Sequence, residues 1–180
     1  MLAGVDVCAI FLRDRASGVF VPSQQYGLKR DAQAGFMDLC LEQDSAVARG
    51  LLAGEQFVVL PARAISNGFS GGELDGPADL DDQSAALLSL VDVDRLLALP
   101  LTAMGAVIGC MVVNHSSRRA AAAGIAERRI GILTGIASQT SIAIENDRLL
   151  RETAEQERLK QELDVARRIQ ASFLPPCCPE

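Results

Sequence analysis

The C-terminal third of the chain constrains the fold most, because one helical pattern runs without a break from about residue 122 to about residue 174. Apolar residues recur there every three or four positions, which is the spacing of one face of an α-helix. The apolar face is broad as far as Asn146, as in a helix that packs on a core. Pro175 and Pro176 end the pattern because proline cannot continue a helix. We therefore expect one long C-terminal helix with two kinds of surroundings.

Beyond Asn146 this helix becomes strongly charged, and residues 145–173 hold seven acidic and six basic residues. A thin apolar stripe on a charged helix is the pattern of a two-stranded coiled coil. So polar a helix gains little stability without a partner, which favours pairing over simple packing on a sheet. We therefore expect a homodimer, weakened by Gln156 as suits a switch. The predicted dimer seam consists of Leu149, Leu159, Leu163, Ala166, Ile169 and Phe173.

The upstream residues predict an α+β fold. Helical spacing occurs at 31–41 and after Ser45, and Pro100 favours an edge or an irregular point of a sheet. Short runs of β-forming residues separated by turn residues predict hairpins, and hairpins mixed with helices indicate a largely antiparallel sheet. The expected strands are 7–12, 19–25, 57–60, 95–101 and 106–113, with a turn at Met104-Gly105 between the last two.

Residues 64–94 differ from the rest, with seven acidic residues, no basic residue and several glycine-containing turns. We expect a loop here, with one or two helical turns at 85–90. Segments that run over a rigid sheet often form binding sites. We therefore expect any small-molecule ligand to lie between the sheet and residues 62–94.

Composition excludes several partners. The net charge is −6, the isoelectric point is about 4.8 and no basic patch stands out, which argues against nucleic acid and anionic membranes. The longest apolar run, residues 103–113, is too short to span a bilayer. The odd number of cysteines and the absence of a CxxC pair favour reduced thiols and a cytoplasmic location. The five are Cys8, Cys40, Cys110, Cys177 and Cys178.

No residue group points to catalysis. The glycine-rich residues 71–73 lack the flanking strand and helix of a phosphate loop, and Asp79, Asp81 and Asp82 lack the spacing of a calcium loop. A plain, solvated acidic loop is favoured in both cases. His115 is the single histidine, and nothing links it to a serine or cysteine nucleophile. We expect no catalytic residue, no metal site and no evident cofactor. We also expect Cys8 and Cys110 to be core residues.

Three segments, in this order and spacing, resemble GAF domains. They are the opening hairpin with Cys8-Ala9-Ile10-Phe11-Leu12 and Tyr26-Gly27-Leu28, the closing hairpin with Leu99-Pro100-Leu101 and residues 105–113, and a final helix at 137–146. The resemblance implies a GAF-like antiparallel sheet flanked by helices. It divides the chain into a sensor core (1–124), a signalling helix (125–174) and a tail (175–180). The helix that usually precedes the first GAF strand is expected to be missing.

Some nucleotide-binding GAF domains carry an Asn-Lys signature followed by Phe and Asp-Glu. Asn114 matches its first position, His115 replaces the lysine, and only Glu127 follows in support. The resemblance therefore identifies no ligand.

Residues 161–175, Gln-Glu-Leu-Asp-Val-Ala-Arg-Arg-Ile-Gln-Ala-Ser-Phe-Leu-Pro, resemble the helical linker of SpoIIE/RsbU-type serine/threonine phosphatases. That linker joins a sensor to a phosphatase domain that uses Mg or Mn. Only five residues follow, so we expect the phosphatase domain to be absent and this chain not to be an enzyme. The two resemblances together imply a sensor that controls a phosphatase through a dimeric helix. The alternatives are a ligand-free dimerisation module, the sensor of another signalling output, and an enzyme.

Overall fold

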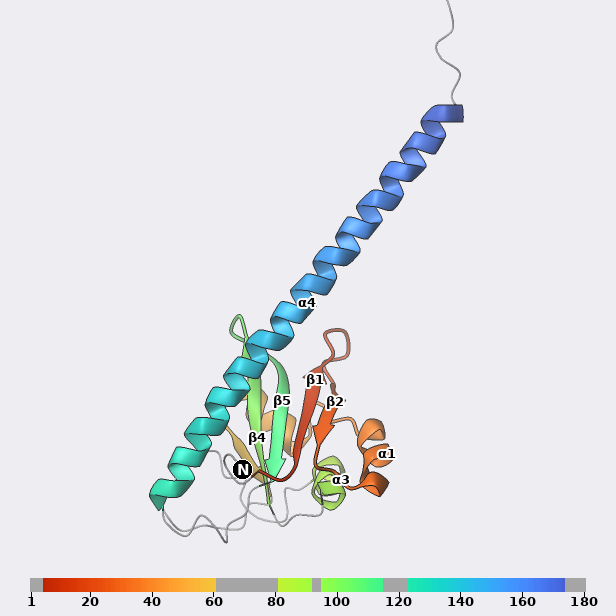
Figure 1. The fold of residues 1–180 in the computed structure, drawn as a ribbon. Helices are drawn as coiled ribbons and strands as arrows, with labels where there is room; N and C mark the ends of the chain where they lie inside the picture. The colour runs from red at the N-terminus through yellow and green to blue at the C-terminus, as the bar shows by residue number, and fades with distance from the viewer. Residues whose placement is uncertain (1–4, 61–80, 92–94, 115–122, 174–180) are drawn as a thin grey trace, which may run out of the picture. The chain divides into compact units, whose positions relative to one another are not determined.

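The computed structural model describes residues 5–60, 81–91, 95–114 and 123–173 (Figure 1). The chain divides into two compact units, residues 1–141 and residues 142–180. The first unit contains a five-stranded sheet, and the second contains only the C-terminal part of the long helix and the tail. No helix in the described ranges has the length and apolar character needed to cross a membrane.

The sheet has the strand order β2-β1-β5-β4-β3, and every neighbouring pair is antiparallel. This confirms the predicted α+β class and its antiparallel sheet. Local turn chemistry sets the two hairpins. Asp14 accepts hydrogen bonds from the Ser17 amide and hydroxyl at 2.8 and 2.6 Å, and Met104 and Gly105 have φ values of 50° and 78° in the second turn. The strands are β1 (Cys8–Arg13), β2 (Phe20–Tyr26), β3 (Val58–Leu60), β4 (Leu96–Ala103) and β5 (Ala106–Asn114).

Pro100 lies in β4, which has a strand on each side, yet at Pro100 itself only one side of β4 is paired. Its β5 partner is Cys110, whereas β3 pairs only with the first three residues of β4, Leu96, Leu97 and Ala98. No β3 residue therefore needs the amide hydrogen that proline lacks. The expectation of an edge-like position for Pro100 is confirmed.

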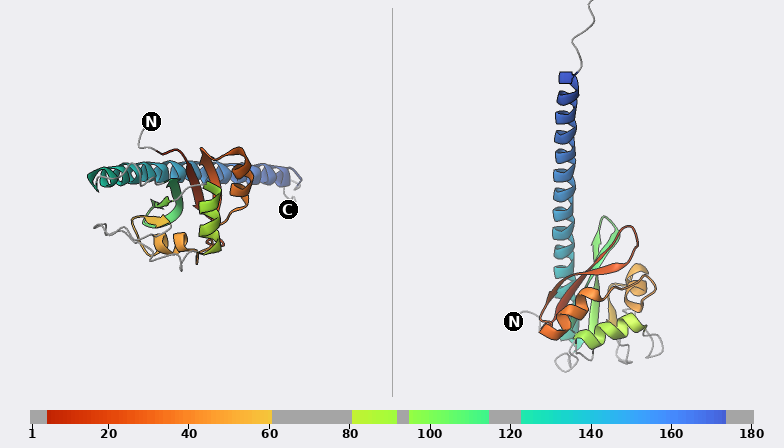
Figure 2. Two further views of the ribbon diagram at one scale, coloured as in Figure 1. Left: turned by 90° about the horizontal axis from the view of Figure 1, so that it is seen from below. Right: turned by 90° about the vertical axis from the view of Figure 1, so that its right-hand side faces the viewer.

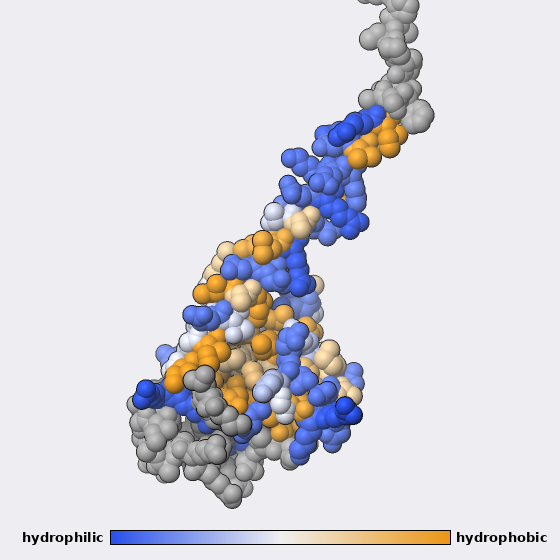
Figure 3. Space-filling model, in the orientation of Figure 1, coloured by the Kyte–Doolittle hydropathy of each residue, from blue (hydrophilic) through white to orange (hydrophobic). Residues whose placement is uncertain are grey.

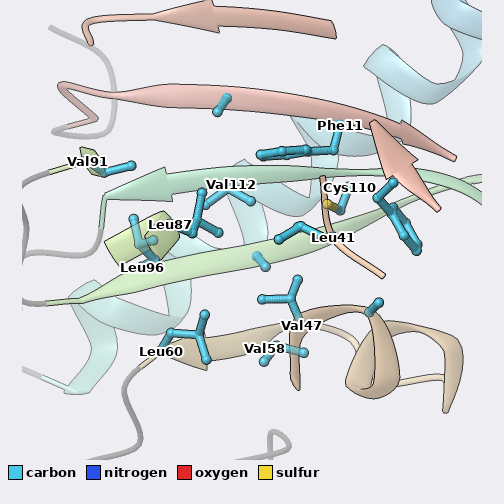
Figure 4. Close-up of a cluster of buried hydrophobic side chains, with 14 of the residues drawn as sticks. Phe11, Leu41, Val47, Val58, Leu60, Leu87, Val91, Leu96, Cys110 and Val112 are labelled. Carbon is cyan, nitrogen blue, oxygen red and sulfur yellow. The ribbon is translucent and has the colours of Figure 1, made fainter. Parts of the chain in front are cut away.

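One face of the sheet packs against α1 (Arg30–Asp38), α2 (Ala46–Leu52) and α3 (Asp82–Val91). Figure 4 shows the apolar side chains that meet between these layers. The Phe11 and Phe36 rings lie edge to face, with their centroids 5.3 Å apart. The fully buried members include Phe11, Phe20, Phe36, Leu41, Val47, Leu60, Leu87 and Cys110.

The opposite face of the sheet is also buried. Leu97, Leu99 and Met111 alternate with the residues of the first core and are at most 3% exposed. The proximal segment of α4 (residues 123–141 of Ala123–Phe173) covers this face, as the views in Figures 1 and 2 agree. Its buried residues follow a spacing of four and are Leu133, Ala137 and Ser141. The helix bounds match the predicted 122–174.

The one or two helical turns expected at 85–90 are observed within the ten-residue helix α3 (Asp82–Val91), so the expected loop is wrong at residues 82–84 and 91. Ser84, Leu87 and Val91 are buried, and this spacing of three and four turns one side toward the core. The serine at the first buried position shortens the apolar pattern, which explains why only one or two turns were expected. Residues 61–80 of the expected loop lie outside the described residues.

Gly109 has a steric reason to be glycine. It pairs with Leu12 of β1, and a Cβ atom at this position would collide with the Phe11 carbonyl oxygen. The missing side chain lets β5 approach β1 closely. Close approach of the two strands therefore explains one glycine of the closing hairpin that resembles GAF domains.

Candidate functional site

The sheet face under α3 is where the sequence places a ligand, and its described part is apolar and close-packed. Phe11 and Leu96 from the sheet and Leu87 from α3 are each at most 1% exposed (Figure 4). A molecule bound between these layers would have to displace α3, because the side chains already occupy the space. In the described part of the chain this face therefore acts as a core.

Asp81 holds α3 against the neighbouring helix. Its carboxylate accepts hydrogen bonds from the Ala46 amide at 2.6 Å, the Ser84 amide at 2.8 Å and the Ser84 hydroxyl at 2.8 Å. One carboxylate thus caps the starts of both α2 and α3. Partial burial opposes ionisation of Asp81, but these hydrogen bonds outweigh it and lower the pKa of the carboxyl group below its ordinary value.

A second contact ties the start of α3 to the same segment. The Gln83 side-chain oxygen accepts a hydrogen bond from the Glu42 amide at 2.7 Å. The expected acidic cluster is thereby divided: Asp81 is a helix cap, Asp82 is exposed in the first turn of α3, and Asp79 lies outside the described residues. In the described ranges, no three His, Cys, Asp or Glu side chains group as a metal site requires.

The two cysteines of the central strands are poor nucleophiles. Burial raises the pKa of the Cys110 thiol to about 12, and burial also raises the pKa of the Cys8 thiol. Since only the thiolate reacts, both groups are inert near neutral pH. Cys110 belongs to the core as expected, whereas Cys8 is half-buried.

Asn114 joins three elements. Its side-chain oxygen accepts from the amides of Asp6 and Val7 at 2.9 and 3.2 Å, and its side-chain nitrogen donates to the Asp6 carboxylate at 3.4 Å. Its carbonyl oxygen accepts from the Arg129 guanidinium of α4 at 3.0 Å. The residue that matched a nucleotide signature is therefore a buried structural junction. His115 and residues 71–73 lie outside the described residues.

Sequence reasoning missed Arg129 and Asp6 as partners of Asn114, and it missed Asp81 as a cap. The aspartate itself, directly before the residues of α3, was the available signal, because aspartate is a preferred N-cap residue. No local signal exists for Asp6, which lies 108 positions from Asn114 in the sequence.

The distal segment of α4 (residues 142–173) contains the predicted seam, and every side chain from Leu149 to Gln170 is exposed. Figure 3 shows apolar patches alternating with charged ones along this segment. Leu149, Leu159, Leu163 and Ile169 are 41, 51, 60 and 52% exposed. Ala166 is exposed too, and the Phe173 side chain lies outside the described residues. Within one copy, then, the described part of the seam stays uncovered.

Ion pairs along the distal segment stabilise its helix without covering the seam. Arg148 pairs with Glu152 at 3.1 Å, and Arg158 pairs with Glu162 at 3.0 Å, both across one helical turn. Such i,i+4 pairs each contribute about 0.3–0.5 kcal/mol. They favour the helical state of this segment and keep its other faces hydrated.

Comparison with solved structures identifies the fold. The GAF domain/HD domain protein from Geobacter sulfurreducens matches with a TM-score of 0.57 and 18% identity, over 82% of this chain and 85% of that chain. The GAF domain of a phosphoenolpyruvate-protein phosphotransferase from Coxiella burnetii gives 0.53 and 16%, over 81% and 74%. This chain has the fold of GAF domains.

A methyl-accepting chemotaxis protein is also similar to this chain, with a TM-score of 0.54, 21% identity, and 83% of each chain covered. No protein-family model and no curated protein matches the chain. At these identities the similarity concerns the fold alone.

Proposed function

We propose that the chain is a sensor and transmitter: its GAF-fold unit responds to a small molecule, and α4 carries the response to an output domain as a homodimeric coiled coil. The proposed output is a SpoIIE/RsbU-type phosphatase in the cytoplasm, and this chain itself has no enzymatic role. The likeness of residues 161–175 to the linker of such phosphatases supports that output.

One observation carries the proposal. Helix α4 runs over 51 residues, and from Leu149 to Gln170 no side chain is buried although apolar residues recur at coiled-coil spacing. A long helix with an uncovered apolar stripe is marginally stable in water by itself and gains stability from a partner. A continuous helix also couples two ends mechanically, because a shift or rotation at one end is transmitted along the hydrogen-bonded backbone.

The structural neighbours support a sensory role in general terms. By their names, they include a GAF domain/HD domain protein, a phosphotransferase and a chemotaxis protein. In the first two, the named GAF domain belongs to a protein with another named part. A GAF-fold unit followed by a long helix fits the same kind of arrangement.

A second candidate function is a dimerisation module that binds no ligand. The observation that favours it is the close-packed sheet face, where Phe11, Leu87 and Leu96 occupy the space between the sheet and α3. Thermal denaturation of the chain against a panel of metabolites separates the two candidates. A ligand specific to the folded state raises the melting temperature by an amount that grows with the logarithm of its concentration relative to its dissociation constant. No shift across nucleotides, organic acids and amino acids would favour the second candidate.

Sedimentation equilibrium of the 180-residue chain tests the dimer. We expect a monomer–dimer equilibrium that Leu163→Asp abolishes, because a carboxylate in the seam would be buried unpaired. Val165→Asp is the matched control, since Val165 is exposed to a similar degree but lies outside the seam. A wild-type chain that stays monomeric, or equal effects of the two variants, would refute the dimeric seam.

Insertions in a longer protein that carries this chain and an output domain test transmission. One residue inserted after Arg151 rotates the distal face by about 100° and should uncouple regulation from the sensor. Seven inserted residues restore the same face of a coiled coil and should preserve regulation. Equal regulation in both insertion variants would contradict transmission through the helix.

A further inference from the structure

The charged residues beside the seam contain information about the orientation of the partner. With Leu149 at heptad position a, Leu163 is also at a, and Leu159 and Ala166 are at d. Between residues 155 and 167 the flanking positions then alternate in sign, whereas Glu152 falls at d and Ile169 of the predicted seam falls at g. Glu155 and Glu162 occupy g, and Lys160 and Arg167 occupy e.

In a parallel two-stranded coiled coil, each g residue lies beside the e residue five positions further along the other helix. Glu155 then faces Lys160 of the second copy, and Glu162 faces Arg167 of the second copy. The two-fold symmetry of a homodimer repeats each contact, so the pairing yields four attractive contacts. All four side chains are exposed in the single chain. Glu162 lies 3.0 Å from Arg158 and Arg167 lies 3.9 Å from Asp164 on the same helix, so in the dimer these two would exchange an exposed partner for one on the second copy.

An antiparallel arrangement would instead place g beside g and e beside e. Glutamates would then face glutamates, and Lys160 and Arg167 would face each other. Like charges at these positions disfavour a pairing and act against the wrong partner orientation. The same four residues thus favour one orientation and oppose the other.

The polar residues of the seam select the register. Gln156 and Gln170 lie at a positions, where a polar side chain specifies register at some cost in stability. In register, each glutamine meets its own counterpart and the two amides can bond to each other. A slip of one heptad would bury Gln156 against Leu163 and leave its amide without a partner.

We propose that the distal segment of α4 binds a second copy of this chain in parallel and in register, with Glu155–Lys160 and Glu162–Arg167 contacts between the copies. This inference rests on the dimeric seam proposed above and adds its geometry. A parallel pair brings the same ends of both distal helices together, so two output domains would begin side by side. A sensor that acts by helix rotation or shift would then move both outputs symmetrically.

Self-crosslinking of single cysteines tests orientation and register in the full chain. In a background with Cys40, Cys177 and Cys178 changed to serine, Leu149→Cys and Leu163→Cys are oxidised separately, and each should form a disulfide-linked dimer. Arg168→Cys places the thiol on the outer side of the helix and should form at least fivefold less disulfide-linked dimer. Only residues near the symmetry axis of an antiparallel pair can meet their own counterpart, so efficient crosslinking at both seam positions requires the parallel arrangement.

The outcomes separate the two proposals. A reduced chain that is dimeric by sedimentation, yet crosslinks at only one seam position or at neither, would overturn the orientation and register while leaving the dimer intact. A chain that is monomeric at all concentrations would overturn the proposed dimer itself. Circular dichroism of each variant confirms that the helix is formed.

Charge reversal gives a second test with neighbouring residues. Arg167→Glu turns two attractive contacts into repulsive ones and should raise the dimer dissociation constant about five- to thirtyfold. Arg168→Glu makes the same change in net charge at an outer position and should alter it about twofold or less. Adding Glu162→Arg to Arg167→Glu should restore affinity toward wild type. Equal weakening by the two single variants would overturn the proposed contacts.

Discussion

Leucines in the proximal and distal segments of α4 lie in opposite environments. Leu133 is 3% exposed within the GAF-fold unit, whereas Leu159 and Leu163 in the second unit are 51 and 60% exposed. The proximal segment buries residues at a spacing of four, as on a sheet face, and the distal segment displays them at coiled-coil spacing. One helix therefore combines a part stabilised within its own chain with a part that, as we propose, is stabilised by another copy.

The two segments therefore differ in whether the burial of their leucines depends on protein concentration. Burial of Leu133 and Ala137 is intramolecular and does not depend on protein concentration. Burial of the distal seam would depend on protein concentration, because it requires association. Protein concentration is thus a variable that distinguishes the two segments.

The largest expected effect is the loss of a buried leucine from the proximal segment. Leu133→Ala should lower the free energy of unfolding of the GAF-fold unit by about 2–4 kcal/mol, because it removes apolar contacts and leaves a cavity. Chemical denaturation followed by circular dichroism measures it. Leu159→Ala serves as the control and should change this transition by less than about 0.5 kcal/mol. Equal losses would break the distinction between the segments.

A smaller effect is expected at Asp81, whose carboxylate caps two helices of the GAF-fold unit. Asp81→Ala should lower the free energy of unfolding by about 1 kcal/mol, the usual cost of replacing a helix cap by alanine. Because its folded-state pKa lies below the ordinary value of 3.8, the ionised form stabilises the fold. This contribution is present above pH 3.8 and is lost as the pH falls through the lower, folded-state pKa.

Denaturation at a series of acidic pH values measures this dependence in wild type and variant. The two stabilities should converge below the folded-state pKa of Asp81 and differ above it. The difference should be the same at low and high protein concentration, because all the partners of Asp81 belong to one chain. A difference that grew with concentration would contradict its assignment to the GAF-fold unit alone.

The smallest expected effect concerns the ion pairs of the distal segment. Arg158→Ala removes the contact with Glu162 at 3.0 Å and should destabilise the distal helix by about 0.3–0.5 kcal/mol. Helix content of the chain at dilute, monomeric concentration, followed by circular dichroism on heating, measures it. The unfolding transition of the GAF-fold unit should not move. A shift in that transition would mean that the two segments are coupled even without dimerisation.

Local patterns predicted much of the fold. The long helix was predicted to span about 122–174 and is observed at Ala123–Phe173. This prediction succeeded because helical periodicity and the prolines that follow it are local features of the sequence. The Met104-Gly105 turn and the β4–β5 hairpin followed from turn chemistry for the same reason. The seam was predicted by spacing and charge, and its dimeric use remains a prediction.

Contacts between distant residues were not predictable in the same way. Asp81 reaches Ala46 across 35 positions, and Asn114 reaches Asp6 across 108. In each pair, the residues next to one partner in the sequence give no indication of the other. Asn114 therefore matched a ligand signature by sequence, whereas its buried hydrogen bonds show a structural role.

Apart from the full length of α3, the amino-acid order alone determined the secondary structure of the described residues, the turns of the hairpins and the change in character along α4, because these depend on neighbours within a few residues. The tertiary structure alone decided which apolar residues are covered, which carboxylate caps two helices and why Asn114 and Gly109 occupy their positions. Burial and hydrogen bonding between distant segments exist only after the chain has folded, so no local pattern encodes them.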